Sequence, residues 1–294
     1  MPFLGELSAL LTACFWSGSA LVFASATKRA GSFDVNITRL ILATVYLVLL
    51  IVVFQLNVHL SGSQILNLAI SGVIGLALGD TFLFRAFQEI GARVTMLIMS
   101  LAPAIAALLA YFVLDETIPM MGITGIAITV AGIGIVVLDR RTEQSTIITT
   151  LGLTLALLAA VGQGAGLVFA KMAFQEGDVN GFVATAIRIV ASLVVLLPVA
   201  VMTKRYASPW KLFRNDRTAF KLTALGSVLG PFLGISFSLF AIEHTKVGIA
   251  ATIMAIVPIL MLPLVRYIYK ERLTWRAIAG AGVAVAGVGV LFLR

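Results

Sequence analysis

Long apolar stretches separated by short polar connections run along the whole chain. A helix needs roughly 20 consecutive apolar residues to cross the hydrocarbon core of a bilayer. Ten stretches come near that length, at about residues 5–26, 35–56, 65–87, 94–114, 119–138, 150–171, 181–202, 222–243, 247–269 and 276–293. They are continuously apolar rather than alternating, which excludes a transmembrane β-barrel. The pattern therefore predicts an all-α integral membrane protein with ten transmembrane helices.

Composition agrees with this interpretation and narrows the chemistry. Of the 294 residues 60% are hydrophobic and 12% charged, and the mean hydropathy is +1.08, so little of the chain is left for a soluble domain. The N-terminus lacks a positive leader and a cleavage site, so we expect the first span to be retained. Cys14 is the only cysteine and His59 and His244 the only histidines, which argues against a disulfide or a metal site. No cofactor is expected.

The net charge of +8 is distributed unevenly between the two predicted faces. Only four of the 21 Lys and Arg residues lie near the face that holds the N-terminus: Lys171, Arg188, Lys246 and Arg294. Excess Lys and Arg in short loops marks the cytoplasmic face. We therefore expect a multi-pass protein of the cell (inner) membrane with both termini outside. The basic loop 203–221 is interpreted as a topology determinant attracted to anionic lipid, with a soluble partner as the alternative; no nucleic-acid partner is expected.

The two halves of the chain repeat each other. With residue 73 placed over residue 228, eighteen of sixty-six positions up to 138 over 293 are identical. The matches include Gly75/Gly230, Gly79/Gly234, Pro103/Pro258 and Glu116/Glu271. With small gaps Arg39 also matches Arg188. The sequence thus predicts two five-helix repeats, in residues 1–140 and 148–294.

An odd number of spans per repeat has a topological consequence. The second repeat must enter the bilayer from the opposite face, so the repeats are expected to be inverted relative to each other. Inverted repeats are typical of secondary transporters with a site near the midplane and alternating access. Gene duplication also builds channels and membrane enzymes. A channel should show a continuous polar stripe through several spans, and the polar residues here are too sparse for one. An enzyme acting on a lipid-linked substrate should show an acid cluster or a metal-binding loop, and neither is visible. We therefore expect a transporter and not an enzyme.

Several motifs resemble a known family. They are "FWSGSALVF" in the first span, "SLAPAIAALLAYFVLDE" in the fourth, "AIVPILMLPLVRYIYKE" in the ninth, and the paired ends "AGIG" and "AGVG". Together they resemble the EamA-type branch of the drug/metabolite transporter (DMT) superfamily over nearly the whole chain. The resemblance implies ten helices, a central cavity and export of small metabolites such as amino acids. It also implies cytoplasmic termini, which the charge distribution contradicts.

Charged residues inside apolar spans are functional candidates because an unpaired charge in hydrocarbon is costly. Arg39 and Asp80 fall at similar depths in adjacent antiparallel spans, so we expect them to form an ion pair. Arg85 follows Asp80 by five residues, which turns it about 140° away around the helix. Arg85 is therefore expected to extend to the interface.

Arg188 is the match of Arg39, but Ile235 stands where Asp80 would be. We expect Arg188 to bind an anionic group of a small-molecule substrate through its planar fork. The alternative is that Arg188 pairs with Glu176, Asp178 or a backbone carbonyl. Asp80 is expected to be a poor proton carrier, because Arg39 stabilises its charged form, which favours weakly coupled or gradient-driven export.

Further candidates lie at matched places in the two halves. Trp16 and Gln163, flanked by small residues, are expected to line the substrate site, with packing as the alternative. Phe84, Ser236 and Ser238 are assigned to the same site. Pro103 and Pro258 fall near mid-span, and we expect them to kink their helices as paired hinges. The glycine series in the fifth and tenth spans suit close helix packing, within the chain or in a homodimer.

Overall fold

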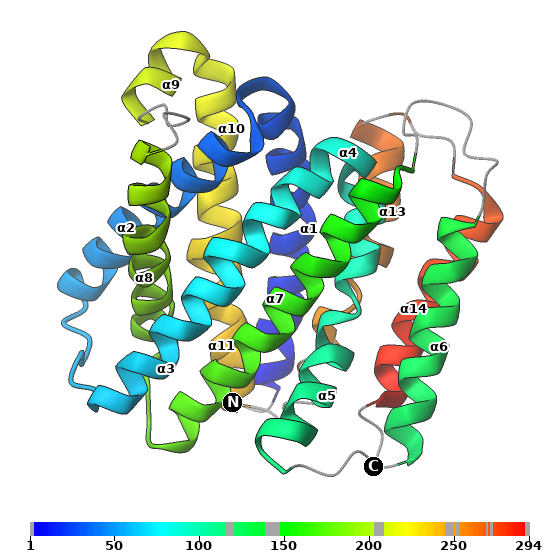
Figure 1. The fold of residues 1–294 in the computed structure, drawn as a ribbon, viewed down its shortest axis with the longest axis horizontal. Coiled ribbons are helices and arrows are strands. Elements are labelled where there is room, and N and C mark those ends of the chain that lie inside the picture. Colours follow the sequence, from blue (N-terminus) through cyan, green and yellow to red (C-terminus); the bar gives the residue numbers. More distant parts are fainter. Residues whose placement is uncertain are drawn as a thin grey trace.

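The computed structural model describes residues 3–115, 120–138, 148–202, 209–244, 250, 253–268, 270 and 273–291. Within these ranges every regular element is a helix (Figure 1). The first half contains α1 (Leu4–Ala30), α2 (Ser32–Val53), α3 (Gly62–Gly72), the π-helix η1 (Val73–Gly79), α4 (Asp80–Met99), α5 (Ala102–Val113) and α6 (Met120–Val137). The second half contains α7 (Thr150–Gln175), α8 (Gly181–Met202), α9 (Pro209–Asn215), α10 (Arg217–Ser227), η2 (Val228–Gly234), α11 (Ile235–His244), α13 (Val257–Ile268) and α14 (Trp275–Leu291). Glu116, Arg140, Arg141, Lys246, Glu271 and Arg294 lie outside the described residues.

Seven helical stretches of the described chain are long and apolar enough to cross a membrane, and shorter apolar helices accompany them. The protein is therefore a multi-pass membrane protein, but the expected count of ten spanning helices is not confirmed. One difference concerns the predicted spans 65–87 and 94–114. Residues 62–99 form one helical run, interrupted only where Gly91 adopts a φ of 73°. In Figure 1 the chain rises along α3, η1 and the start of α4 to the top of the view, and the rest of α4 then descends.

The internal repeat is visible in the helix bounds themselves. A shift of 155 residues maps α3, η1 and α5 onto α10, η2 and α13, and a shift of 149 maps α2 onto α8. The caps match too, because Ser61 and Asp216 occupy equivalent positions and each side chain accepts a backbone hydrogen bond at the start of its helix. Such caps satisfy N–H groups that the first helical turn leaves free. The two halves thus form the same local structure in the register that the sequence predicted.

The two prolines expected to kink their helices lie instead in the first turns of new helices. Pro103 is the second residue of α5, and Pro258 is the second residue of α13. Turn residues 100–101 and 255–256 precede them. Proline is well tolerated there, because the first turn of a helix needs no intrahelical N–H donor. The prediction of a kink inside a continuous helix is therefore wrong. Instead, one helix ends and another begins at both matched places.

Helices of one half pack against helices of the other. α1 lies along α10 and η2, while α7 lies along α3, η1 and α4. Small residues permit close approach: a Cβ on Gly166 would stand 3.2 Å from the Cα of Gly75, and the Ser71 hydroxyl donates to the Gly166 carbonyl at 2.6 Å. Close backbone approach through small residues is characteristic of membrane helices. The interior is thus built by both halves together.

α6 and α14 pack side by side along one side of the bundle, at the right of Figure 1. A Cβ on Gly132 would stand 2.3 Å from the Ala284 nitrogen, and one on Gly287 would stand 2.3 Å from the Thr129 nitrogen. The glycine series are therefore used for packing within one chain. These contacts give no support to the expected homodimer.

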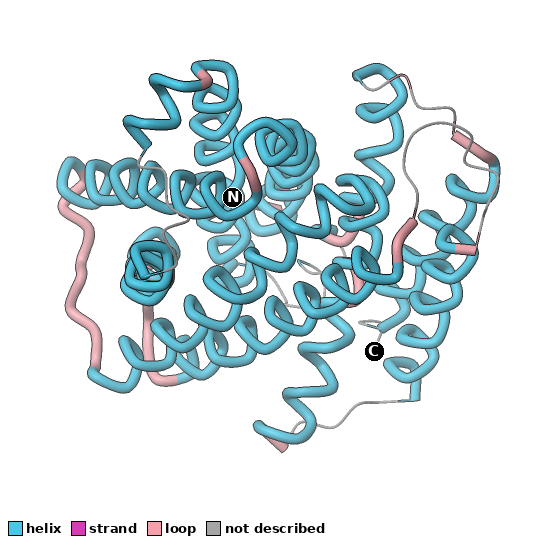
Figure 2. Tube along the Cα trace, turned by 45° about the horizontal axis from the view of Figure 1, so that its top comes forward, coloured by secondary structure: helices cyan, strands magenta, loops and turns pink. Residues whose placement is uncertain are grey.

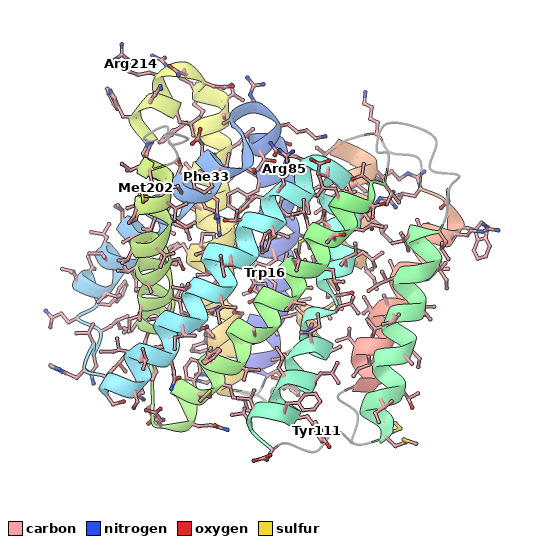
Figure 3. The ribbon with its side chains drawn as sticks, in the orientation of Figure 1. Trp16, Phe33, Arg85, Tyr111, Met202 and Arg214 are labelled. Atoms are coloured by element: carbon pink, nitrogen blue, oxygen red, sulfur yellow. The ribbon has the colours of Figure 1, made fainter. Side chains whose placement is uncertain are left out.

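The ends of the bundle differ in charge. The start of α1 and the end of α14 lie at the same end, and α9 lies at the other (Figure 1), where Figure 3 also shows Arg214. Arg29, at the end of α1, pairs with Asp216 across this basic end at 2.9 Å. At the opposite end a connection over residues 54–61 joins α2 to α3 (Figure 2).

Candidate functional site

A buried ion pair joins α2 to α4. The side chain of Arg39 donates from Nη2 to Oδ2 of Asp80, and the two residues are only 3% and 4% exposed. Asn36, one turn before Arg39, accepts from Nε at 3.0 Å and from Nη2 at 2.9 Å. Charge-assisted hydrogen bonds of this kind satisfy a buried charge that would otherwise be costly. The predicted pairing of Arg39 with Asp80 is confirmed.

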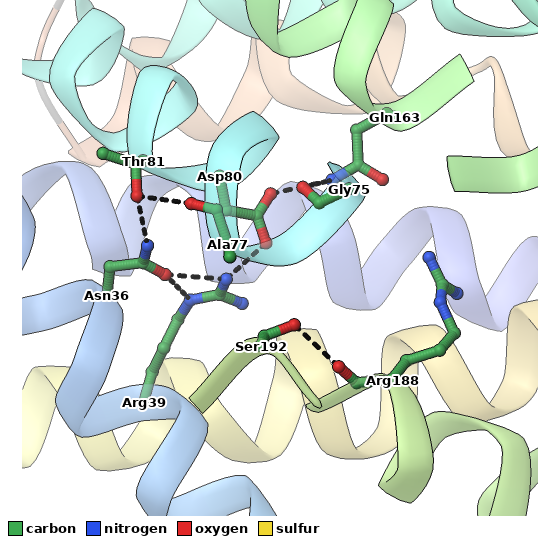
Figure 4. A network of polar contacts seen from close by, with 9 residues as sticks. All are labelled: Asn36, Arg39, Gly75, Ala77, Asp80, Thr81, Gln163, Arg188 and Ser192. Carbon is green, nitrogen blue, oxygen red and sulfur yellow. Dashed lines mark hydrogen bonds and ion pairs between the residues drawn. The ribbon is translucent and has the colours of Figure 1, made fainter. Parts of the chain in front are cut away.

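The polar cluster extends from this pair in two directions (Figure 4). Asn36 Nδ2 donates to Thr81 Oγ1 at 3.0 Å, and Thr81 in turn donates to the Ala77 carbonyl at 2.6 Å. On the other side, Gln163 Nε2 donates to Asp80 Oδ1 at 2.8 Å and to the Gly75 carbonyl at 3.2 Å. Since Gln163 belongs to α7, the carboxylate of Asp80 is shared between side chains of both halves.

Two aromatic rings enclose the Arg39 guanidinium. Its central carbon lies 4.8 Å from the ring centroid of Phe84 and 5.7 Å from that of Phe23. The two rings meet edge to face, with centroids 4.9 Å apart. Cation–π contacts stabilise a desolvated guanidinium. The structure thus places Phe84, assigned to the substrate site from sequence, in the core against Arg39.

A π-helix positions the carboxylate of Asp80. Residues 73–79 of η1 widen the helix, and the N–H of Asp80 donates to the carbonyl of Gly75 five residues earlier. The matched segment η2 does the same, with Ile235 donating to Gly230. Short π-helical turns occur frequently at functional sites. The paired glycines of the repeat were the available sequence signal for these turns, which the periodicity analysis missed.

Arg188 lies in α8 and is as buried as Arg39, at 3% exposure. Its Nε has no hydrogen-bond partner, and its guanidinium makes no hydrogen bond or ion pair within the described part of the chain (Figure 4). Glu176, one expected partner, instead accepts hydrogen bonds from Ser61, Ser63 and Asn67. The alternative in which Arg188 pairs with Glu176 is therefore wrong.

The surroundings of Arg188 show where its backbone and guanidinium lie. The backbone of Arg188 packs directly on Gly72, where a Cβ would stand 2.1 Å from the Arg188 carbonyl oxygen. The Nη2 atom lies 3.5 Å from the point where a Cβ of Gly75 would stand, and Gln163 Oε1 lies 3.7 Å from the same point. Arg188 therefore borders the polar cluster without bonding to it.

The remaining candidates take different places. Trp16 lies mid-bundle (Figure 3) with its ring against Gly234. It takes the place that Gly162 has in the second half, one residue before Gln163, so the predicted match of Trp16 with Gln163 is off by one residue. The Ser236 hydroxyl is buried and unpartnered, whereas Ser238 donates to the Ile235 carbonyl at 2.7 Å. Arg85 is apart from the cluster: its side chain is 53% exposed and pairs with Glu89 at 2.9 Å, in keeping with its predicted position at the interface.

The described residues contain no group of three or more His, Cys, Asp or Glu side chains that could hold a metal ion. The donor set of the polar cluster consists of two guanidinium groups, one carboxylate, amides and hydroxyls. Such groups bind polar or charged organic molecules by hydrogen bonds and charge.

One comparison with known proteins identifies a family, and another supports the fold. A model of the EamA-like transporter family matches residues 3–138 and again residues 150–293. A solved structure titled "Crystal structure of protein" is similar to this chain with a TM-score of 0.69 and 18% sequence identity, covering 97% of this chain and 95% of that one. At that identity the likeness shows the fold alone. A search of curated proteins found no match.

Proposed function

The chain belongs to the EamA-like transporter family of the DMT superfamily, and from this premise we propose that it is a secondary transporter. Its substrates would be small metabolites such as amino acids or related polar or amphipathic compounds, and the direction would be export. Access would alternate between the two faces as two inverted five-helix repeats, residues 1–140 and 148–294, rock against each other.

The observation that carries this proposal is the polar cluster where the two halves meet. The Asp80 carboxylate accepts hydrogen bonds from Arg39 of its own half and from Gln163 of the other half. Buried charges at a repeat interface are expensive, and in membrane proteins they mark substrate or ion pathways. The matched helix bounds support the repeat, and the common end reached by the start of α1 and the end of α14 supports an even number of crossings.

Each candidate residue has a proposed task. Gln163 and Arg188 would contact substrate directly, and Trp16 and Ser236 would line the space across from them. Asp80 and Arg39 would set the electrostatic field, with Phe84 holding Arg39 in place. Ser238 would line the same space as Trp16 and Ser236. Pro103 and Pro258 would act as hinges, since both follow a break in their helices.

We further propose an orientation in the inner membrane with the basic end in the cytoplasm and the termini outside. The Arg29–Asp216 pair and the exposed Arg214 lie at the basic end. Lys and Arg near a cytoplasmic face are attracted to anionic lipids and resist translocation. A cysteine introduced at Gly62, where a Cβ would meet open space, should react with an impermeant maleimide added outside intact cells. Labelling that occurs only after the membrane is permeabilised would contradict this orientation and place the termini in the cytoplasm.

Transport itself is tested with purified protein in liposomes loaded with one unlabelled amino acid at a time. A transporter exchanges substrate, so internal substrate should accelerate uptake of the same labelled compound. A channel gives flux without this acceleration, and an enzyme gives a modified product. Repeating the assay with and without a pH gradient tests coupling: a strong dependence that Asp80→Asn abolishes would contradict weakly coupled export.

A further inference from the structure

The buried cluster has an excess of positive charge. Arg39 and Arg188 are both nearly inaccessible, and Asp80 is the only buried acid among the described residues. Asp80 is hydrogen-bonded to Arg39 and to Gln163. The cluster therefore contains two cations and one anion, and the cation left over is Arg188. A buried charge without a counter-charge is unfavourable, so a protein that keeps one has a use for it.

The second repeat lacks the two groups that hold the arginine of the first, Asn36 and Asp80. The position of Asn36 is taken by Thr185, whose hydroxyl donates back to the Gly181 carbonyl at 2.7 Å and is thereby used within its own helix. The position of Asp80 is taken by Ile235. Neither replacement offers a carboxylate or amide oxygen to a guanidinium. Arg188 thus lacks a hydrogen-bonded partner at both of the positions that hold Arg39 in the first half.

The side chain of Gln163 lies near the Arg188 guanidinium. Gln163 directs its Nε2 at two acceptors, the Asp80 carboxylate and the Gly75 carbonyl, which fixes the amide so that its Oε1 points away from them. Nη2 of Arg188 and Oε1 of Gln163 both flank the place where Gly75 lacks a side chain. Because Gly75 has no side chain, no Cβ stands beside the Nη2 donor of Arg188.

We propose that Arg188 is the binding site for the oxyanion of a small organic anion, a carboxylate or a phosphate monoester. A planar guanidinium donates two parallel hydrogen bonds to such a group. A carboxylate would bring the excess charge of the cluster to zero, and a phosphate monoester would more than offset it. Organic cations are disfavoured here, because Arg188 lies beside the site and the one buried acid among the described residues, Asp80, is already paired with Arg39. This inference rests on the proposed transport function and narrows its substrate class to anions.

The experiment measures thermal stability of the purified full-length protein against two matched series of probes. One series is benzoate, phenyl phosphate, benzamide and benzylammonium; the other is butyrate, butyl phosphate, butyramide and butylammonium. We expect at least one oxyanion to raise the melting temperature with saturation, and its amide and ammonium counterparts to have no effect. Whether the carboxylate or the phosphate acts identifies the group. No effect of any oxyanion, or an equal effect of the amides, would overturn the inference.

Variants test the role of Arg188. Arg188→Gln should weaken binding of the active oxyanion about tenfold or more, the loss expected for a charged hydrogen bond, and Arg188→Lys should retain part of it. Arg85→Gln removes the same charge from an exposed site and should leave binding unchanged. Gly75→Ala keeps every charge and makes only ordinary contacts, yet fills the space beside Nη2, so it should also weaken binding. Unchanged affinity in Gly75→Ala and Arg188→Lys would contradict the site even if Arg188→Gln failed to fold.

The same probes separate this inference from the proposed function. If the oxyanion binds through Arg188 but is not exchanged across liposomes, the anion site stands and the transport proposal fails. If the protein exchanges a neutral or cationic compound and Arg188→Gln exchanges it equally well, transport stands and the anion site is wrong.

Discussion

Arg39 and Arg188 hold the same place in the two halves of one chain, and their surroundings are opposite. Arg39 has a carboxylate, an amide oxygen and two aromatic rings around it. Arg188 has equal burial and no hydrogen-bonded partner for its guanidinium among the described residues. The π-helix that precedes Asp80 recurs before Ile235 without any acid. A π-helical turn with Pro231 inside it thus forms in the second half without an ion pair, and the matched arginines differ in the partners of their charge.

This contrast separates stabilising residues from binding residues. A complete pair with matched hydrogen bonds stabilises the contact between α2 and α4, whereas an isolated buried cation destabilises its own half until a ligand neutralises it. On this account the first half supplies rigidity around Asp80 and the second half supplies the binding group.

Asp80→Ala should have the largest effect on stability. It leaves Arg39 buried without its acid and removes the acceptor of Gln163, so we expect a loss of about 3–5 kcal/mol in the free energy of unfolding. Unfolding in mixed micelles of rising denaturing-detergent content measures it. Glu89→Ala, which breaks the exposed pair with Arg85, serves as the control and should change stability by less than about 1 kcal/mol. Equal losses in the two variants would contradict a buried structural pair.

Transplanting the partners of Arg39 into the second half should abolish the asymmetry. In the double variant Thr185→Asn and Ile235→Asp, Arg188 gains the acceptors that Arg39 has, and oxyanion affinity should fall about tenfold or more. Ile235→Asn is the matched control, since it adds polarity without charge. Titration of the active probe followed by melting temperature gives both affinities. Full affinity in the double variant would show that a local acid does not compete with the ligand.

Gln163→Leu should have an intermediate effect. Asp80 loses one charged hydrogen bond, for which we expect a loss of about 1.5–3 kcal/mol in the free energy of unfolding. Combining the substitution with Asp80→Asn in a double-mutant cycle isolates the contact. A coupling energy near zero would mean that Gln163 and Asp80 do not interact in the folded protein.

Removing the exposed Arg29–Asp216 pair at the basic end should have the smallest effect on stability, and this effect should depend on pH. The Ala219 N–H and then Arg29 hold the pKa of the Asp216 carboxyl below its usual value. A group with a lowered folded pKa contributes stability that is present above its unfolded pKa and is lost as the pH falls through its folded pKa. Wild type should therefore be slightly more stable than Asp216→Asn at neutral pH, and the difference should shrink on acidification below the ordinary aspartate range. Melting curves across that range measure it, and a difference that grows on acidification would reverse the sign.

The sequence was sufficient for the repeat and for the central pair. The register of 73 over 228 follows from glycines and prolines that occur at the same spacing in both halves, and the bounds of η1 and η2 agree with it. Arg39 and Asp80 could be paired because few charges occur in apolar spans and helix rise fixes their depth.

Contacts between the two halves were harder to predict. Gln163 was assigned to the site, but its bond to Asp80 depends on how closely α7 approaches η1, which periodicity does not encode. Asn36 has the same spacing to Arg39 as any residue one helical turn away, so the sequence alone does not reveal the contact. Proline composition predicted a break near Pro103, but not that a new helix begins there, because proline suits both a kink and a first turn.

The central claim is that the two matched arginines have opposite energetic roles, and one comparison tests it most directly. The free energies of unfolding of Arg39→Gln and Arg188→Gln should be measured under identical conditions without added ligand. The account predicts that Arg39→Gln lowers stability by about 3–5 kcal/mol, because it leaves Asp80 buried without its cation, while Arg188→Gln leaves stability unchanged or raises it by about 1 kcal/mol. Equal destabilisation by the two substitutions would contradict it, since Arg188 would then be as much a structural residue as Arg39.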